Sequence, residues 1–289
     1  MKILVTGRHG QLARSLAELG GDEIHLMGRA DLDLAVAGSA RSAILAARPD
    51  LVVNAAAFTA VDLAESEEAA AHRINADGAG EVAGVARELG VPIIHISTDY
   101  VFDGRATAPY GETADTAPIN AYGRTKLAGE GAVRAATPDH LILRTSWLIS
   151  PFGKNFVRNM VDLGQQRETL SVVADQHGNP TSALDLADAI LAVARRWAAG
   201  DRTGMGQTYH LVGTGVASWF DLAVAVQDEL GHLGAKSTIV SPITTADWPT
   251  PAERPAYSAL DSSAFTRDFG LRLPDWRASL GPIVARLAT

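Results

Sequence analysis

The sequence contains no cysteine. This excludes disulfide bonds, thiolate metal sites and a catalytic thiol. It also lacks an apolar run long enough to span a bilayer, and its first residues follow a strand pattern instead of a charged segment followed by an apolar one. We therefore expect no membrane partner, and a cytoplasmic protein is the default expectation.

Positive charge is scarce as well, because 25 Lys and Arg residues stand against 33 Asp and Glu residues, for a formal net charge of −8. The sequence has no basic cluster and no basic stripe with interleaved aromatic residues, so nucleic acid is not an expected partner. Small anionic ligands are compatible with this balance, since a few arginines and helix N-termini can bind phosphate whatever the overall sign.

Apolar, β-rich runs alternate with alanine-rich helical patterns in the first half of the chain. This alternation predicts an α/β fold of the Rossmann type, a doubly wound parallel sheet with helices on both faces. Strands are predicted near residues 2–6, 24–27, 51–54, 92–97 and 140–145, and long helices over 66–89 and 121–136.

The pattern loosens after about residue 150. We predict an NAD(P)-binding domain over residues 1–150 and a smaller C-terminal substrate-binding lobe over 151–289, with a soft boundary because segments of such a lobe can return to the sheet. In the second part, short strands are predicted near 170–173, 207–212 and 237–240, helices near 155–165, 184–199 and 218–231, and a proline-rich passage over 242–255.

The first predicted strand leads directly into a glycine turn and then into an amphipathic stretch. The spacing Gly7-x-x-Gly10-x-x-Ala13 lets the backbone turn sharply at Gly7 and approach a pyrophosphate at Gly10, while the small Ala13 lets the helix pack closely on the strand. The helix N-terminus would then face the phosphates with its free N–H groups. The alternative is a glycine turn that binds no ligand.

Tyr122 and Lys126 lie four residues apart on a predicted helix and therefore share one face. The Lys126 ammonium could stabilise the Tyr122 phenolate, lower the pKa of Tyr122 from about 10, and so allow proton exchange with a carbonyl oxygen near neutral pH. The same spacing also fits an ordinary solvated helix face.

A second polar segment lies at the end of the strand predicted over 92–97, where Ser97, Thr98 and Asp99 follow an apolar run. Ligands of a doubly wound sheet bind beyond the carboxyl ends of its strands, so these side chains should face the crevice. A hydroxyl there could hydrogen-bond a substrate carbonyl beside Tyr122. Alternatively, the hydroxyls only satisfy backbone groups at the strand end.

Together with other segments, these motifs resemble the extended short-chain dehydrogenase/reductase family over essentially the whole length. The segments are Gly7-x-x-Gly10-Gln11-Leu12, Asn54 to Asp62, Asn75-Ala76, Ser97 to Gly104, Tyr122 to Glu130, Arg144 to Trp147, Asn155 to Val157, and Asp175-Gln176-x-Gly178-x-Pro180-Thr181. Within that family, the resemblance is closest to the branch that reduces the C4 ketone of dTDP-4-dehydro-L-rhamnose. It implies hydride transfer from NAD(P)H to that ketone, with Tyr122 as proton donor and Lys126 as its partner.

The resemblance implies roles for further residues. Thr98 would tune Tyr122 and, with Asp99, contact the sugar. Trp147 would pack against the sugar ring, since an indole face suits the C–H side of a hexose. Arg254 could meet the substrate diphosphate. The residues expected along the cofactor are Gly7, Gly10, Gln11, Leu12, Asp33, Leu34, Ala55, Ala56 and Ala57, together with Tyr122 and Lys126.

Cofactor choice depends on the end of the strand predicted over 24–27. NAD-specific proteins often place an acid there to hold the ribose 2′-OH, whereas this chain has Gly28-Arg29. Because Arg29 could accept a 2′-phosphate, we predict that NADPH is used at least as well as NADH. Asp31 and Asp33 are the contrary candidates for a ribose contact.

The sequence shows no grouping of His, Asp and Glu that demands a metal, so no metal ligand is predicted and Mg²⁺ stays possible but unsupported. A homodimer is possible. Two other functions are open: another nucleotide-sugar reductase, epimerase or dehydratase on the same scaffold, and a non-catalytic regulatory subunit resembling that of methionine adenosyltransferase. The intact set of Thr98, Tyr122 and Lys126 favours catalysis.

Overall fold

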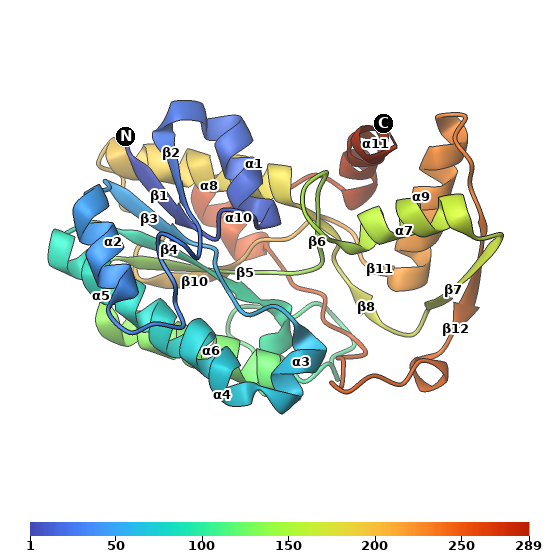
Figure 1. The fold of residues 1–289 in the computed structure, drawn as a ribbon, viewed down its shortest axis with the longest axis horizontal. Coiled ribbons are helices and arrows are strands. Elements are labelled where there is room, and N and C mark those ends of the chain that lie inside the picture. The colour runs from blue at the N-terminus through green and yellow to red at the C-terminus, as the bar shows by residue number, and fades with distance from the viewer. Residues whose placement is uncertain (289) are drawn as a thin grey trace.

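A six-stranded parallel sheet forms the centre of the larger lobe in the computed structural model, which describes residues 1–288 (Figure 1). The strand order is β10-β5-β4-β3-β1-β2, and every neighbouring pair is parallel. The strands are β1 (Ile3–Thr6), β2 (Ile24–Met27), β3 (Leu51–Asn54), β4 (Ile93–Thr98), β5 (His140–Thr145) and β10 (Gln207–His210). The predicted doubly wound α/β fold is confirmed.

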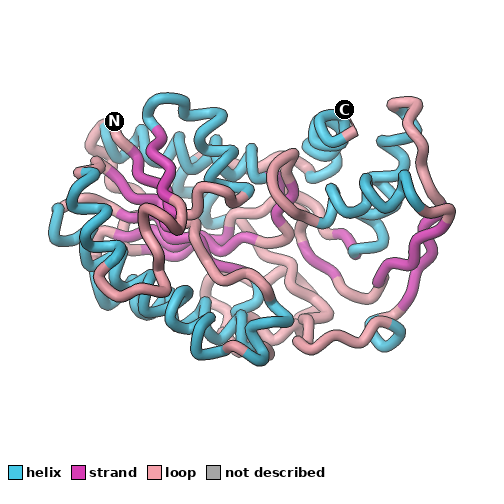
Figure 2. Tube along the Cα trace, viewed as in Figure 1, coloured by secondary structure: helices cyan, strands magenta, loops and turns pink. Residues whose placement is uncertain are grey.

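Helices cover both faces of this sheet, which explains why its central strands are apolar without alternation. Ile3 and Val5 point to one side, into a core with helices α1 (Gln11–Gly20), α8 (Ala183–Ala198) and α10 (Ser263–Phe269). Leu4 points to the other side, into a core with α2 (Ser39–Ala47), α5 (Gly78–Leu89) and α6 (Ala121–Ala136). Figure 2 shows the strands enclosed between these helices.

The single helix predicted over residues 66–89 is interrupted in the structure. It consists of α4 (Glu68–His72), a π-helical turn over Arg73–Asp77, and α5, and a separate helix α3 (Val61–Ser66) precedes it. The π turn places the Asn75 side chain against the loop after β3, where it accepts from the Phe58 N–H at 2.7 Å and donates to the Phe58 carbonyl at 3.1 Å. π-turns often serve such a local function, which a periodic pattern does not reveal.

A smaller lobe has its own core, formed chiefly by helices α7 (Phe156–Gln166), α9 (Trp219–His232) and α11 (Trp276–Leu287). Its short strands pair as β7 (Thr169–Val173) with β12 (Ile239–Ile243), and β8 (His177–Gly178) with β11 (Ala217–Ser218). A further pair, β6 (Leu148–Ile149) with β9 (Thr181–Ser182), lies where the chain passes between the lobes (Figure 1). The two-residue strands are too short to produce a periodic signal in the sequence.

Several segments beyond residue 150 belong to the sheet lobe. β10 extends the sheet beside β5, and α8 packs along α1. The chain therefore crosses between the lobes more than once, and a boundary at residue 150 stays a prediction. In the described part of the chain, none of the helices has the length and apolar character needed to cross a membrane.

Candidate active site

Two adjoining cavities lie at the carboxyl ends of the central strands, where the doubly wound fold places its ligands. One, of about 390 Å³, is lined by Tyr122, Lys126, Ser97, Thr98 and Asp99. The other, of about 290 Å³, extends toward the end of β2. His9, Gly10, Ala55, Ala57 and Thr59 line both cavities. An elongated ligand can therefore run from the end of β2 to the Tyr122 hydroxyl.

The glycine turn after β1 forms the middle of this path. Gly7 has a φ of +89°, and a Cβ there would lie 3.2 Å from the Ala56 Cα, so only glycine fits without strain. Gly10 is the N-cap of α1 and has no side chain to cover the N–H groups of the first turn. These groups can serve a phosphate. Gln11 and Leu12 continue the lining of the larger cavity.

Thr6 anchors the facing loop. Its hydroxyl accepts from the N–H groups of Ala55 at 3.1 Å and Ala56 at 2.9 Å and donates to the Asn54 side chain at 2.8 Å. This triple use of one hydroxyl fixes the Ala55–Ala57 backbone opposite the glycine turn, on the side where the resemblance expects the cofactor.

Two arginines line the smaller cavity, which extends toward the end of β2. Arg29, Asp33 and Leu34 line it, as expected for residues beside an adenosine, and so does Arg8, which the sequence reasoning overlooked. Arg8 pairs with Asp31 at 2.7 Å, so one of the two carboxylates that could have held a ribose is already engaged. The position of Arg8 inside the glycine turn is the sequence feature that could have predicted its place in this cavity.

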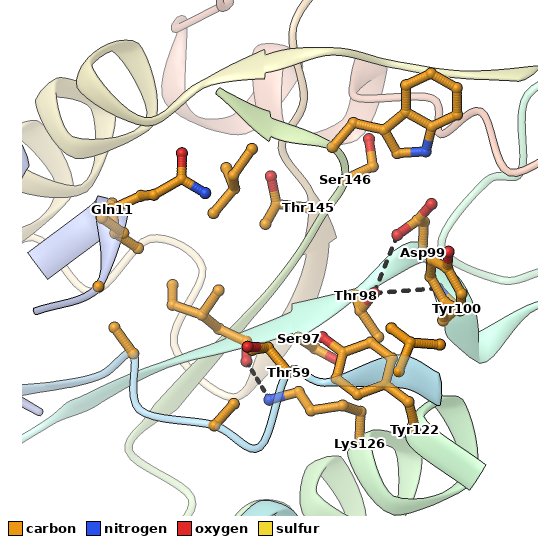
Figure 3. Close-up of a pocket in the computed structure, with 18 of the residues that line it drawn as sticks. Gln11, Thr59, Ser97, Thr98, Asp99, Tyr100, Tyr122, Lys126, Thr145 and Ser146 are labelled. Carbon is orange, nitrogen blue, oxygen red and sulfur yellow. Dashed lines mark hydrogen bonds between the residues drawn. The ribbon is translucent and has the colours of Figure 1, made fainter. Parts of the chain in front are cut away.

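Helix α6 brings Tyr122 and Lys126 into the larger cavity (Figure 3). Asn120 caps the helix by accepting from the Gly123 N–H at 2.8 Å. Gly123 also lets the helix approach η3 (Asp99–Val101), because a Cβ there would overlap the Tyr100 carbonyl oxygen. The Lys126 ammonium donates to the Ile96 carbonyl at 2.7 Å.

The electrostatics of this pair correct one expectation. Burial raises the pKa of Tyr122 to about 12, and only the Thr98 hydroxyl opposes that rise. Burial lowers the pKa of Lys126 to about 8, against the attraction of Glu130. The expected lowering of the Tyr122 pKa by Lys126 is therefore wrong for this arrangement, because the ammonium is bonded to the Ile96 carbonyl and desolvation dominates.

Thr98 and Asp99 end β4 beside Tyr122. The Thr98 hydroxyl donates to the Asp99 carboxylate at 3.0 Å and accepts from the Tyr100 N–H at 3.2 Å (Figure 3). Burial raises the pKa of Asp99 to about 6. Ser97 lines the same cavity, but its hydroxyl donates to the Glu130 carboxylate at 2.6 Å. Thr98 is thus the hydroxyl of this segment that interacts with Tyr122.

Trp147 lines the larger cavity with Trp219, which begins α9 and was missed by the sequence reasoning. The two indole rings stack with centroids 3.5 Å apart and planes within 3°. Trp147 has a φ of +44°, and Gly178 lies against its ring, where a Cβ would be 2.7 Å from Nε1. One face of Trp147 is therefore covered by Trp219. The predicted contact between Trp147 and a sugar ring has to be tested at both tryptophans.

Arg254, which was expected at the substrate diphosphate, is not among the residues that line the larger cavity. It binds the Asp62 carboxylate through two hydrogen bonds, at 3.0 and 2.8 Å. Lys154 does line the cavity, beside Gly153. Among residues 1–288, no three His, Asp or Glu side chains form a group that could hold a metal ion.

A doubly wound sheet, a glycine turn after the first strand and a buried Tyr–Lys pair beyond β4 together define a nicotinamide-dependent oxidoreductase of the short-chain dehydrogenase/reductase class. The chain belongs to the family described as "RmlD substrate binding domain", whose model matches residues 1–289. This confirms the resemblance drawn from the sequence motifs.

Individual relatives agree with this family. A dTDP-4-dehydrorhamnose reductase of Sinorhizobium fredii is 46% identical over 286 residues, which cover 98% of this chain and 97% of the relative. The crystal structure of a dTDP-4-dehydrorhamnose reductase from Clostridium acetobutylicum has a TM-score of 0.90 at 38% identity and full coverage of both chains. That of the Bacillus anthracis enzyme in complex with NADP has a TM-score of 0.89 at 36% identity, with 99% of each chain covered.

Proposed function

We propose that the protein reduces the C4 ketone of dTDP-4-dehydro-L-rhamnose to dTDP-L-rhamnose, with NADPH or NADH as hydride donor. The observation that carries this proposal is the continuity of the two cavities, which share five lining residues and join the adenosine end at Arg29 to the acid at Tyr122. The relatives that match over nearly the full length are reductases of this kind, one of them in complex with NADP.

The residues along the path fit a dinucleotide. The turn at Gly7 and Gly10 leaves room for a pyrophosphate against the N-terminus of α1, where a side chain at Gly7 would meet Ala56. Gln11 and Leu12 would flank the pyrophosphate, Asp33 and Leu34 the adenosine, and Ala55 to Ala57 the opposite side. When bound with its ring beside Tyr122, a reduced nicotinamide supplies the hydride.

Tyr122 would hold the ketone oxygen and deliver the proton. Because burial raises its pKa to about 12, the phenol is protonated at neutral pH and is ready to donate. As the C4 oxygen gains negative charge, the proton passes from the Tyr122 hydroxyl to that oxygen and an alcohol results. The Thr98 hydroxyl is the neighbouring group that stabilises the phenolate that is left, and Lys126 would hold the cofactor ribose beside it.

Thr98 and Asp99 would orient the sugar. The Thr98 hydroxyl interacts with Tyr122 and can donate to the same ketone oxygen, and the buried Asp99 carboxylate can accept from a sugar hydroxyl. Trp147 and Trp219 form part of the wall of the cavity and would limit the access of water once the substrate is bound. Arg254 or Lys154 would provide the positive charge for the substrate diphosphate.

The experiment is to follow oxidation of NADPH and of NADH with enzymatically prepared dTDP-4-dehydro-L-rhamnose, with and without a chelator. Formation of dTDP-L-rhamnose supports the proposal, and equal rates with the chelator argue against a required Mg²⁺. Tight cofactor binding without turnover contradicts it. A stoichiometric enzyme partner recovered in a pull-down would then favour a regulatory subunit, and turnover of another keto-sugar would favour a related reductase. A homodimer and a cytoplasmic location stay predictions.

A further inference from the structure

Glu130 is a buried carboxylate that does not line the larger cavity and has no direct contact with the proposed reacting groups. It follows Lys126 by four residues and Tyr122 by eight on α6, so all three side chains lie along one face of the helix. Its side chain is 0% exposed. A charge in such a place is costly unless it is fully paired, and its presence therefore calls for a physical reason.

The Glu130 carboxylate is fully engaged. Arg144 on β5 binds it through two hydrogen bonds, each of 2.8 Å, from Nε and Nη2. The Ser97 hydroxyl donates to it at 2.6 Å, and Arg134, one turn further along α6, donates at 2.9 Å. Bidentate and charge-assisted bonds of this kind fix geometry as well as adding energy.

Two successive residues of β4 hold this face of α6. The Ile96 carbonyl accepts from the Lys126 ammonium at 2.7 Å, and the next residue, Ser97, donates to Glu130. Because Arg144 adds a third attachment from β5, the helix is fixed against sliding along the sheet or rotating about its axis at the level of Lys126. Displacements of about 1 Å at a catalytic group are enough to cost activity.

Glu130 also acts on Lys126 through its charge, as the other charged groups around Lys126 make clear. On β4, His95 is held neutral because burial lowers its pKa. Asp99 of η3 acts on Tyr100 and Tyr122. Arg134 on α6 and Arg144 on β5 are both bound to Glu130. Around the rest of α6, Arg124 pairs with Glu68, Arg73 pairs with Asp77 and Glu81, and Glu65 accepts from the Ala121 N–H. Glu130 is the group whose charge acts on Lys126 and opposes its desolvation.

We propose that Glu130 is a positioning residue for the Tyr122–Lys126 pair: it fixes α6 against β4 and β5, and it supplies the negative charge that keeps the Lys126 ammonium charged in a buried site. This inference rests on the proposed reductase function, because it assigns Glu130 a part in that reaction through Lys126.

The central test is the pH profile of kcat/KM for Glu130→Gln, which keeps the shape of the side chain and removes its charge. Without that charge the ammonium is less stable and the folded-state pKa of Lys126 falls. Activity that needs protonated Lys126 is then lost at lower pH, and we expect the basic limb to move down by on the order of one pH unit. Glu130→Asp keeps the charge and shortens the side chain, so it should lower kcat while leaving the basic limb in place.

Glu68→Gln is the matched control. It also removes a carboxylate bound to an α6 arginine, Arg124, but this pair lies at the surface, with both side chains nearly half exposed. Its rate and pH profile should equal those of the parent protein. An unchanged basic limb in folded Glu130→Gln, or an equal shift in Glu68→Gln, overturns the inference.

Glu130→Gln leaves Arg144 buried without its partner, which can prevent folding. The double variant Glu130→Gln with Arg144→Gln removes both charges, and a smaller downward shift is expected, because a cation near the ammonium is lost together with the carboxylate. The result need not depend on turnover, because the chain has only four lysines, Lys2, Lys126, Lys154 and Lys236. NMR titration of 13C-labelled lysine should show the Lys126 pKa lowered in the variant. Absence of turnover in the parent protein would contradict the proposed function, whereas an unmoved Lys126 titration would contradict the role of Glu130.

Discussion

The indole rings of Trp147 and Trp219 lie parallel with their centroids 3.5 Å apart. Trp147 follows strand β5 of the sheet, and Trp219 begins α9 of the smaller lobe. Ser218 and Asp221 fix the start of α9 through a capping box, so the Trp219 backbone is well held. The stack therefore ties the smaller lobe to the wall of the larger cavity, which both tryptophans line.

Trp219→Ala should raise KM for the sugar nucleotide on the order of tenfold, because the variant loses a stacked aromatic pair and part of the cavity wall. Affinity for NADPH should change little, since Trp219 lies beyond the residues shared by the two cavities. Steady-state kinetics with both substrates measures this. Trp248→Ala, at a tryptophan that is 62% exposed, is the control and should leave KM unchanged. An unaltered KM in Trp219→Ala would remove Trp219 from the substrate site.

Tyr122→Phe should lower turnover by a factor on the order of 10² to 10⁴ while NADPH binding stays nearly intact, because only the acid is removed. Single-turnover rates and a fluorescence titration of NADPH separate the two effects. Tyr209→Phe is a suitable control, since that hydroxyl donates to Asp268 at 2.7 Å, outside both cavities. Surviving turnover in Tyr122→Phe would mean that another group protonates the ketone.

The elements that the sequence predicts best are those with a repeating pattern or a motif of local geometry. The central strands follow from continuous apolar runs, and α6 was predicted with its observed bounds, Ala121–Ala136. The place of Ser97, Thr98 and Asp99 in the cavity followed from the rule that parallel strands present their carboxyl ends at one edge, whereas the pairing of Thr98 with Tyr122 was implied by the family resemblance.

The sequence pattern does not predict contacts between segments that lie far apart in the chain. Trp219 enters the cavity because of how the smaller lobe folds, and a tryptophan at a helix start carries no mark of that. Arg254 was expected at the substrate, but its partner, Asp62, is almost two hundred residues away in the chain. The sign of the Tyr122 pKa shift depends on burial, which spacing along one helix does not reveal.

Arg29→Ala should reduce kcat/KM for NADPH about tenfold while sparing NADH, because a guanidinium is lost where the 2′-phosphate would lie. Arg8→Ala tests whether the neighbouring arginine shares this role, since it lines the same cavity but is paired with Asp31. The ratio of kcat/KM for the two cofactors is the measurement. A strong preference for NADH in the parent protein would contradict the argument from Arg29.

Gly129 and Gly131 on α6 make a matched pair for testing how closely this helix must pack. A Cβ at Gly129 would overlap the backbone carbonyl oxygen of Asn75, whereas a Cβ at Gly131 would have no described heavy atom within 4 Å. Gly131→Ala should stabilise the protein by up to about 1 kcal/mol, because alanine is the better helix former. Gly129→Ala should destabilise it by about 2 kcal/mol, since backbone atoms cannot rotate away as a side chain can.

Urea denaturation of the two variants measures this difference, and activity provides a second readout. Asn75 holds the loop after β3 through Phe58, and it also donates to Thr125 on α6 at 3.0 Å. A displaced π turn would therefore move the loop that faces the glycine turn, and NADPH affinity should fall in Gly129→Ala but not in Gly131→Ala. Equal stability of the two variants would show that α6 can shift without cost, and the fixed position argued for Lys126 and Tyr122 would then lose its basis.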